Sequence, residues 1–234
     1  MKEARIGTRE EWLAARKALV AEEKAHTRAR DALSERRRAL PWYRIDKAYR
    51  FKSGRGPMTL ADLFAGRSQL VVYHFMYGPD WEQGCKSRSF WADSFDGIVE
   101  HLAQRDVTLA CVSIAPLAML DAFKQRMGWH FNWVSSEGSD FNADFGVSPP
   151  ASGPMIYNFD KAIKEPGEMP GVSVFAKDAS GAIFHTYSCY ARGLDMLNSA
   201  YQILDLVPKG RDEGDLPYSM SWLRHKDRYG TDSS

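Results

Sequence analysis

The sequence predicts an α/β fold in which a mixed sheet is flanked by helices and preceded by a long N-terminal helix. Between residues 70 and 128, apolar runs typical of buried strands alternate with segments of helical periodicity, which implies parallel strands joined by right-handed crossovers. Two later apolar runs, 172–175 and 182–187, are separated by a short turn and predict an antiparallel hairpin. The 234 residues, with 44% hydrophobic and 26% charged side chains, suit one core with extensions.

We expect three segments: an N-terminal helical extension over 1–40, a central domain over 41–207 and a C-terminal tail over 208–234. In the first, Thr8-Arg9-Glu10-Glu11 matches a capping box, and neither Pro nor Gly follows before Pro41. A helix of about 30 residues is about 45 Å long, more than a small domain needs.

The apolar stripe of this helix is narrow. It consists of Trp12, Ala15, Leu19, His26, Ala29 and Leu33. A stripe of this width docks on the domain or pairs with another subunit, and we predict that it contributes to a homodimer.

The segments that follow are short. We expect an entry strand over 43–51, a turn at 53–57, and one capped helical turn over 59–64. A buried strand over 69–76 then leads through a loop to a helix over 86–104.

A second buried strand is predicted over 107–113, and Pro116 begins a helix that runs to Gly128. Because consecutive parallel strands end at the same edge of a sheet, both strand ends and Cys85 should meet there.

The remaining segments are predicted as follows: a short strand over 131–135, a turn of structure over 141–147, a loop over 148–171, the hairpin, and a last amphipathic helix over 193–206. In the polar tail, Trp222 and Tyr229 are candidate anchors. Trp and Phe side chains near the Cys85 segment and after Gly128 are expected to be mostly core.

Cys85 stands where the loop meets the predicted helix. The positive end of the helix dipole and the free backbone N–H groups there favour thiolate over thiol, and Lys86 and Arg88 add positive charge. One interpretation is a nucleophilic thiolate that forms a mixed disulfide. The other is a vestigial cysteine in a degenerate site.

The other two cysteines are weaker candidates. Cys189 returns on the hairpin toward the same edge, but two strands of separation give about 9 to 10 Å, whereas disulfide Cα atoms lie about 4.4 to 6.8 Å apart. Cys111 lies in an apolar strand and is expected to be an inert core residue. An odd cysteine count leaves a free thiol, which fits a reducing compartment.

Composition argues against two classes of partner. The N-terminus has no apolar signal region, and the longest apolar run is shorter than the about 18 residues of a membrane span, so we expect a cytoplasmic protein and no membrane contact. The net charge is +1, and the small excess of Lys and Arg in residues 1–40 is weak support for nucleic acid, which is not expected as a partner.

Long segments of the chain resemble a family. They are GTREEWLAARKALV, SQLVVYHFMYGPDWEQGC, SFWADSFDG, DVTLACVS, MGWHFNWVSSEGSDFNADFGV and HTYSCYARGLDMLNSAYQILDLVPKGRDE. Nearly the whole sequence resembles a family of bacterial thioredoxin-fold proteins described as predicted dithiol-disulfide oxidoreductases. The resemblance implies a thioredoxin-like fold and a thiol or disulfide partner, either a small thiol or a protein.

Two departures from related patterns restrict the chemistry. The resemblance implies a second cysteine three residues after Cys85, but Arg88 stands there, so one motif cannot run a dithiol cycle. The peroxiredoxin signature is also incomplete, because Glu82 stands where a Thr is typical and Pro79 lies six residues before Cys85 rather than seven.

The candidate catalytic residues are therefore Cys85, Arg88, Pro170 and Arg192. The resemblance places a cis-proline lining the active site at Met169-Pro170. Arg192 is a candidate to hold the thiolate or an acidic substrate, or else to cap a helix or pair with Asp195.

No cofactor and no metal are expected. His74 alternates with apolar residues on a buried strand and is interpreted as a core histidine. A Cys85, His74, His185 metal set lacks an adjacent ligand pair. The predicted function is a monothiol oxidoreductase, and the alternative is a non-catalytic thioredoxin-fold binding or scaffold protein.

Overall fold

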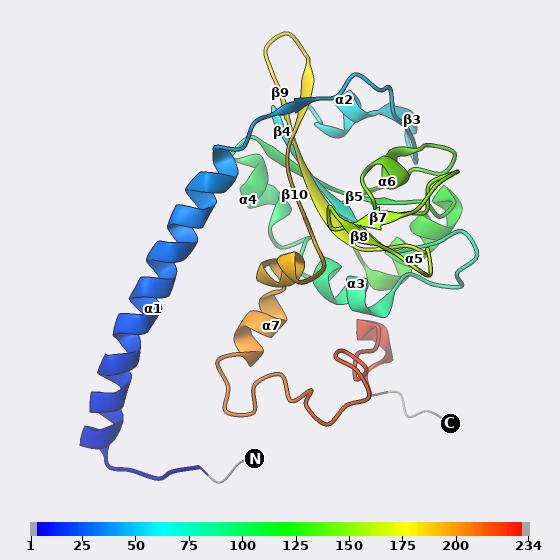
Figure 1. Ribbon diagram of the computed structural model, residues 1–234. Coiled ribbons are helices and arrows are strands. Elements are labelled where there is room, and N and C mark those ends of the chain that lie inside the picture. Colours follow the sequence, from blue (N-terminus) through cyan, green and yellow to red (C-terminus); the bar gives the residue numbers. More distant parts are fainter. Residues whose placement is uncertain (1–3, 231–234) are drawn as a thin grey trace.

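The computed structural model describes residues 4–230. Its main sheet has eight strands in the order β1-β10-β9-β4-β5-β6-β2-β3, and β7 and β8 form a separate pair (Figure 1). The strands are β1 (Tyr43–Arg44), β2 (Arg50–Ser53), β3 (Gly56–Thr59), β4 (Gln69–His74), β5 (Val107–Ser113), β6 (Asn132–Ser135), β7 (Ile156–Tyr157), β8 (Lys161–Ala162), β9 (Gly171–Lys177) and β10 (Ile183–Tyr190). The helices are α1 (Arg9–Arg38), α2 (Leu60–Leu63), α3 (Lys86–Ala92), α4 (Val99–Ala103), α5 (Leu117–Met127), α6 (Phe141–Asp144) and α7 (Ser199–Leu204), with 3₁₀ segments η1 (Ala191–Leu197) and η2 (Lys226–Arg228).

The sheet centre has the thioredoxin-like arrangement. β4 and β5 are parallel and are connected through α3 and α4, whereas β9 is antiparallel to β4 and forms a hairpin with β10. The order β10-β9-β4-β5 therefore combines one β-α-β unit with one hairpin. This confirms the predicted fold class, a thioredoxin-like mixed sheet flanked by helices with a long N-terminal helix.

Apolar residues cover both faces of the sheet, as a doubly covered sheet requires. On β4, Tyr73 belongs to one hydrophobic cluster, which includes Trp91 of α3 and Leu120 of α5. Val72, pointing to the other face, belongs to a second cluster with Leu63 and Phe141. The expectation that the Trp and Phe residues near Cys85 are mostly core is confirmed, except that Phe141 packs on the opposite face from α3.

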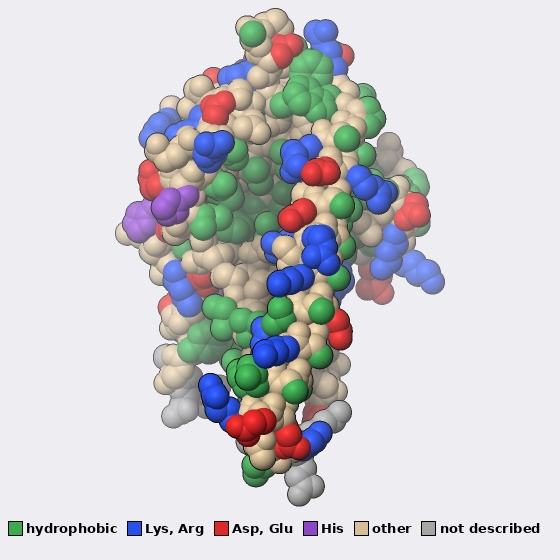
Figure 2. Space-filling model, turned by 90° about the vertical axis from the view of Figure 1, so that its left-hand side faces the viewer, with side chains coloured by type: hydrophobic (Ala, Val, Ile, Leu, Met, Phe, Trp, Pro, Cys, Tyr) green, Lys and Arg blue, Asp and Glu red, His purple; other side chains and the backbone are tan. Residues whose placement is uncertain are grey.

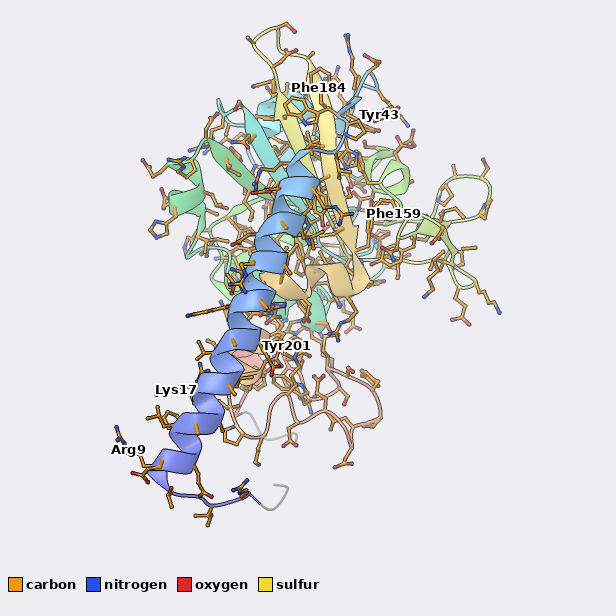
Figure 3. The ribbon with its side chains drawn as sticks, turned by 60° about the vertical axis from the view of Figure 1, so that its left-hand side comes forward. Arg9, Lys17, Tyr43, Phe159, Phe184 and Tyr201 are labelled. Atoms are coloured by element: carbon orange, nitrogen blue, oxygen red, sulfur yellow. The ribbon has the colours of Figure 1, made fainter. Side chains whose placement is uncertain are left out.

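Helix α1 begins with the predicted capping box, in which the Thr8 hydroxyl accepts from Glu11 N–H and the Glu11 carboxylate accepts from Thr8 N–H. None of its residues is buried, and the whole predicted stripe is exposed. It extends along one side of the domain (Figure 1), and Figure 3 shows Arg9 and Lys17 toward its far end, away from Tyr43 and Phe184 of the sheet. The Arg37 guanidinium lies over the Tyr187 ring of β10, 5.6 Å from its centroid.

The predicted strand over 43–51 is wrong in extent. Its first residues form β1 beside β10, whereas Arg50 begins β2 near the opposite edge of the sheet. The chain between them crosses one face, where Lys47 Nζ contacts the Asp144 carboxylate at 2.6 Å and Tyr49 OH donates to the same carboxylate at 2.8 Å. Tertiary contacts of this kind override the local strand propensity.

The predicted helix over 86–104 is also wrong, because it divides into α3 and α4. The backbone N–H groups of His130 and Phe131 donate to the Asp96 carboxylate, and Trp129 Nε1 donates to Asp93 at 2.8 Å. These acceptors hold the turn between the two helices against the segment before β6.

The last predicted helix, over 193–206, consists of η1 followed by α7. Asn198 separates them in an extended conformation, and its side chain caps α7 by accepting from Tyr201 N–H at 2.8 Å. The loop predicted over 148–171 contains the short β7–β8 pair, which sequence periodicity did not reveal. Among the helices of residues 4–230, none combines the length and the apolar character needed to cross a membrane.

Candidate functional site

Cys85 lies at the sheet edge where the parallel strands β4 and β5 end, as predicted. It is the N-cap residue of α3 and is half-buried. Its backbone N–H donates to Met76 O at 3.1 Å, and its carbonyl accepts from Ser89 N–H at 2.9 Å. The thiol is thus attached to a backbone that is fixed on both sides.

The loop before Cys85 is held by close packing and by the C-terminal tail. A Cβ atom at Gly84 would lie 2.8 Å from the Phe75 ring and 2.9 Å from the Phe123 ring, so only glycine fits there without movement. His225 Nε2 donates to Gly84 O at 2.9 Å, and its imidazole is buried. Burial lowers the pKa of His225. The tail segment, red in Figure 1, is therefore part of the candidate site, which the sequence did not indicate.

Arg88 lies one helical turn after Cys85, so both side chains start from the same face of α3. Within residues 4–230 it forms no ion pair with a carboxylate, and its Nε is buried without a hydrogen-bond partner. Its guanidinium lies over the Trp91 ring, 4.9 Å from the centroid. Burial raises the pKa of Tyr73, an effect that Arg88 opposes and Cys85 reinforces. The site therefore holds a thiol, a phenol and an uncompensated cation.

Pro170 precedes β9 as predicted, but the expectation of a cis-proline is wrong, because the described chain contains no cis peptide bond. The Pro170 carbonyl accepts from Tyr157 OH at 2.7 Å, and that hydroxyl accepts from Ala191 N–H at 2.8 Å. Burial raises the pKa of Tyr157 to about 12, against the lowering effects of the Ala191 N–H and Arg88. Pro170 is thus tied to β7 and to the end of β10.

Arg192 follows β10 and lines a cavity that neither Cys85 nor Arg88 lines. Its side chain is 84% exposed, and its Nη2 lies 3.7 Å from Asp195 Oδ2, so it takes the pairing with Asp195 that was one of the roles the sequence left open. It lines a cavity of about 730 Å³ along the free edge of β10, together with Cys189 and with Tyr43 and Phe159, which are labelled in Figure 3. Neither Cys85 nor Arg88 lines that cavity.

A second cavity, of about 670 Å³, lies at the N-terminal ends of β5 and β6. It is lined by Val107, the first residue of β5, and by His130, which comes before β6. Because these residues stand at the N-terminal ends of the strands, this cavity is separated from Cys85 by the length of the sheet.

The three cysteines are free, and the pairing of the strands shows how far Cys189 lies from β4. Cys189 pairs with Val172, and Val172 pairs with Tyr73 of β4, so Cys189 lies two strands away from β4, about 10 Å at 4.8 Å per strand. Cys111 is fully buried, and burial raises its pKa well above the ordinary value, which confirms it as a core thiol. Burial also raises the pKa of Cys189.

A chain of buried polar side chains crosses three strands. His74 Nε2 contacts Ser173 Oγ at 2.9 Å, Ser173 Oγ contacts Ser188 Oγ at 2.9 Å, and Ser188 Oγ contacts His185 Nε2 at 2.7 Å. Burial, with a smaller effect from His185, lowers the pKa of His74 to about 3. The interpretation of His74 as a core histidine is confirmed, but the two serines were not predicted as its partners.

Glu168 is a second titratable group with an unusual environment. Its carboxyl lies beside Ser148 and Asn142, and burial raises its pKa to about 7. It stands two residues before Pro170, on the segment that leads to β9. Within the described part of the chain, no group of three or more His, Cys, Asp and Glu side chains is gathered as a metal ion would need.

Comparison with solved structures finds proteins of low sequence identity. The peroxidoxin BcpB of Mycobacterium tuberculosis is 12% identical with a TM-score of 0.46, covering 70% of this chain and 97% of that one. A peroxiredoxin Q of Xanthomonas campestris is 16% identical with a TM-score of 0.44, covering 71% and 98%. The mitochondrial 2-Cys peroxiredoxin of Plasmodium falciparum is 13% identical with a TM-score of 0.43, covering 71% and 94%.

No curated protein matches the sequence significantly. A protein-family model, in contrast, matches residues 1–229, which includes α1, the sheet, Cys85 and the tail that contacts Gly84. The chain therefore belongs to the family described as "Bacterial protein of unknown function (DUF899)".

Proposed function

We propose that this protein is a monothiol oxidoreductase that exchanges thiols and disulfides through Cys85. The observation that carries the proposal is the half-buried thiol at the N-cap of α3 with the uncompensated guanidinium of Arg88 one turn away. A positive charge beside a thiol favours the thiolate, which is the nucleophile in exchange.

The proposed reaction is one displacement at sulfur. The Cys85 thiolate attacks one sulfur of a partner disulfide, a new S–S bond forms, and the old S–S bond breaks. The second partner sulfur leaves with the electron pair as a thiolate and takes a proton from water. Cys85 is oxidised, the leaving sulfur is reduced, and a second thiol molecule restores Cys85 by attacking the mixed disulfide.

The second thiol must come from another molecule. Arg88 stands at the position of a resolving cysteine, and Cys111 and Cys189 are buried. Cys189 lies on β10, two strands away from β4, and this distance of about 10 Å exceeds the Cα–Cα distance of a disulfide, about 4.4 to 6.8 Å. Free thiols of this kind fit a reducing compartment, so we also propose a cytoplasmic location.

Pro170 contributes to the site through its carbonyl, which fixes Tyr157 within electrostatic reach of Arg88. A catalytic role for Arg192 stays a prediction, and its contact with Asp195 favours a local ion pair instead.

The alternative function is a non-catalytic thioredoxin-fold binding protein. The presence of Arg88 where the family resemblance implies a cysteine favours this alternative, because loss of that cysteine is what a vestigial site would show. The two functions differ in whether Cys85 reacts.

Oxidised glutathione is expected to give one adduct per chain, located on Cys85 by mass spectrometry. The Cys85→Ser variant should give none, whereas Cys189→Ser should react as the unchanged protein does. A Cys85–Cys189 bridge would replace the monothiol mechanism with a two-cysteine cycle. If Cys85 reacts neither with oxidised glutathione nor with iodoacetamide at neutral pH, the binding function is correct instead.

We further propose that α1 contributes to a homodimer. Large hydrophobic side chains on α1 are exposed, among them Trp12 at 62% and Leu19 at 48%. Figure 2, in which α1 runs down the front of the molecule, shows hydrophobic side chains along the helix and on the domain surface beside it. In proteins most of the stability of a helix comes from packing of its apolar face, and α1 has no buried residue, so a second copy is its simplest partner.

A chain shortened to begin at Leu40 is expected to sediment as a monomer, because it lacks α1. In the full-length chain, Leu19→Asp should weaken the dimer, and Lys17→Ala, which changes no apolar side chain, should leave it intact. A full-length protein that is monomeric at tens of micromolar would disprove the dimer.

A further inference from the structure

A cavity with a cationic lining lies beside the Cys85 loop. Its volume is about 290 Å³, and it is lined by Gln83, Gly84, Lys86, Arg224, His225 and Arg228. Cys85 stands between two of these residues, and its Cα is about 3.8 Å from the Cα of each neighbour. Cys85 is not itself a lining residue, but both of its chain neighbours line the cavity.

The lining contains cations and no acidic side chain. Lys86 Nζ donates to Ser221 O at 3.2 Å, which leaves two of its three N–H donors for a ligand. The pKa of His225 is lowered by burial, so its imidazole is neutral near pH 7. Lys86 and Arg224 thus give the cavity positive charge, whereas Arg228 Nε also approaches the Asp227 carboxylate, at 4.0 Å.

Two acidic groups that act on His225, Asp227 of the tail and Asp93 at the end of α3, are already engaged by other cations. Arg126 binds the Asp227 carboxylate through two hydrogen bonds, at 2.7 and 3.0 Å. Lys226 Nζ contacts the Asp93 carboxylate at 3.1 Å. These contacts compensate the two acids, and among the described residues Lys86 and Arg224 of the lining form no ion pair with a carboxylate.

The cavity is also held in place by tertiary contacts from two distant parts of the chain. His225 donates to Gly84 O, and its ring packs edge to face on Phe123 with centroids 5.3 Å apart. Arg126 of α5 donates to Gln83 Oε1 at 3.0 Å. The tail cations are therefore fixed against the Cys85 loop.

We propose that this cavity selects the exchange partner, and that the partner is a small thiol or disulfide that carries carboxylate groups. This inference rests on the proposed reactivity of Cys85. Cations around a reactive group raise the local concentration of anionic substrates. The volume is near the lower limit for small-molecule sites, about 300 to 1,000 Å³, which suits one arm of a small disulfide.

The test compares three small symmetric disulfides that differ in charge: dithiodipropionate (anionic), hydroxyethyl disulfide (neutral) and cystamine (cationic). The rate of mixed-disulfide formation on Cys85 is measured for the full-length protein and divided by the rate of the same disulfide with mercaptoethanol. At low salt the anionic disulfide is expected to react about tenfold faster than the neutral one, and cystamine slowest. At about 1 M salt, where the screening length is about 3 Å, the advantage should shrink severalfold.

Two variants locate the source of the preference. Arg224→Ala is expected to lower the anionic-to-neutral ratio about threefold, and Lys86→Ala combined with Arg224→Ala should lower it further. Lys17→Ala removes one positive charge from α1 and should leave the ratio unchanged.

The outcomes separate the two proposals. Equal normalised rates for the three disulfides would overturn the inference and leave the monothiol function in place. An anionic preference that survives the double substitution would also overturn it, because Arg88 alone would then supply the charge. Absence of reaction with all three disulfides would overturn the monothiol function itself.

Discussion

The Phe141→Ala variant is expected to lose about 3 to 5 kcal/mol of unfolding free energy, the usual cost of removing a buried Phe ring. Phe141 is fully buried and makes edge contacts with Tyr49 and Phe51, at centroid distances of 5.0 and 4.9 Å. It also lies 4.8 Å from the Phe145 ring. Because these rings join the β2 region to α6 over the sheet, the cavity left by the substitution cannot close easily. Urea unfolding at constant pH measures the loss.

Phe159→Ala is the matched control, since it removes the same ring from an exposed position. Phe159 is 73% exposed, and its contact with the Tyr190 ring has a centroid distance of 5.4 Å. A single aromatic pair contributes about 0.5 to 1.5 kcal/mol, so the loss should stay near or below 1 kcal/mol. Equal losses for the two variants would contradict the packing described for Phe141.

The parts of the fold that the sequence predicted well are those with strong local signals. The strand β5 matches the predicted range 107–113, because seven consecutive apolar or small residues with neither Gly nor Pro leave few alternatives. The capping box at Thr8 placed the start of α1, and the capped turn predicted over 59–64 contains α2. The position of Cys85 followed from the strand end before it and the helix after it.

Features that depend on distant contacts were not predictable in this way. The hydrogen bond between His225 Nε2 and Gly84 O joins residues 141 positions apart, and nothing in the sequence around either residue indicates this contact. The division of the helix after Ala92 depends on Asp93 and Asp96, which accept from Trp129 and the residues after it. The cationic cavity beside the Cys85 loop has the same origin, because the tail supplies Arg224, His225 and Arg228 to its lining.

Buried titratable groups make the pH dependence of stability a sensitive test of the core. The pKa of His74 is about 3 in the folded protein and about 6.5 when unfolded, so between these values the unfolded state binds the extra proton. Its contribution to stability therefore falls as pH decreases, by about 1.4 kcal/mol per pH unit. Glu168 acts in the opposite sense, because its pKa is raised to about 7 and the folded state keeps a proton that the unfolded state releases above about pH 4.5.

Between pH 4.5 and 6.5 the two effects oppose each other. The contribution of His74 is therefore obtained by subtracting the unfolding free energy of a variant that lacks this side chain. The unfolding free energy of the unchanged protein minus that of His74→Gln is expected to rise by about 2.3 kcal/mol from pH 4.5 to pH 6.5. This is less than about 1.4 kcal/mol for each of the two units, because the unfolded imidazole is already half deprotonated at pH 6.5. Burial also lowers the pKa of His185 and His225, but both residues remain in the two proteins, and their contributions largely cancel in the subtraction. The corresponding difference for Glu168→Gln should have the opposite slope, which provides the control for sign. A His74→Gln difference that does not change with pH would mean that His74 is protonated in the folded state, and the buried chain through Ser173 and Ser188 would then have to carry a charge that burial strongly disfavours.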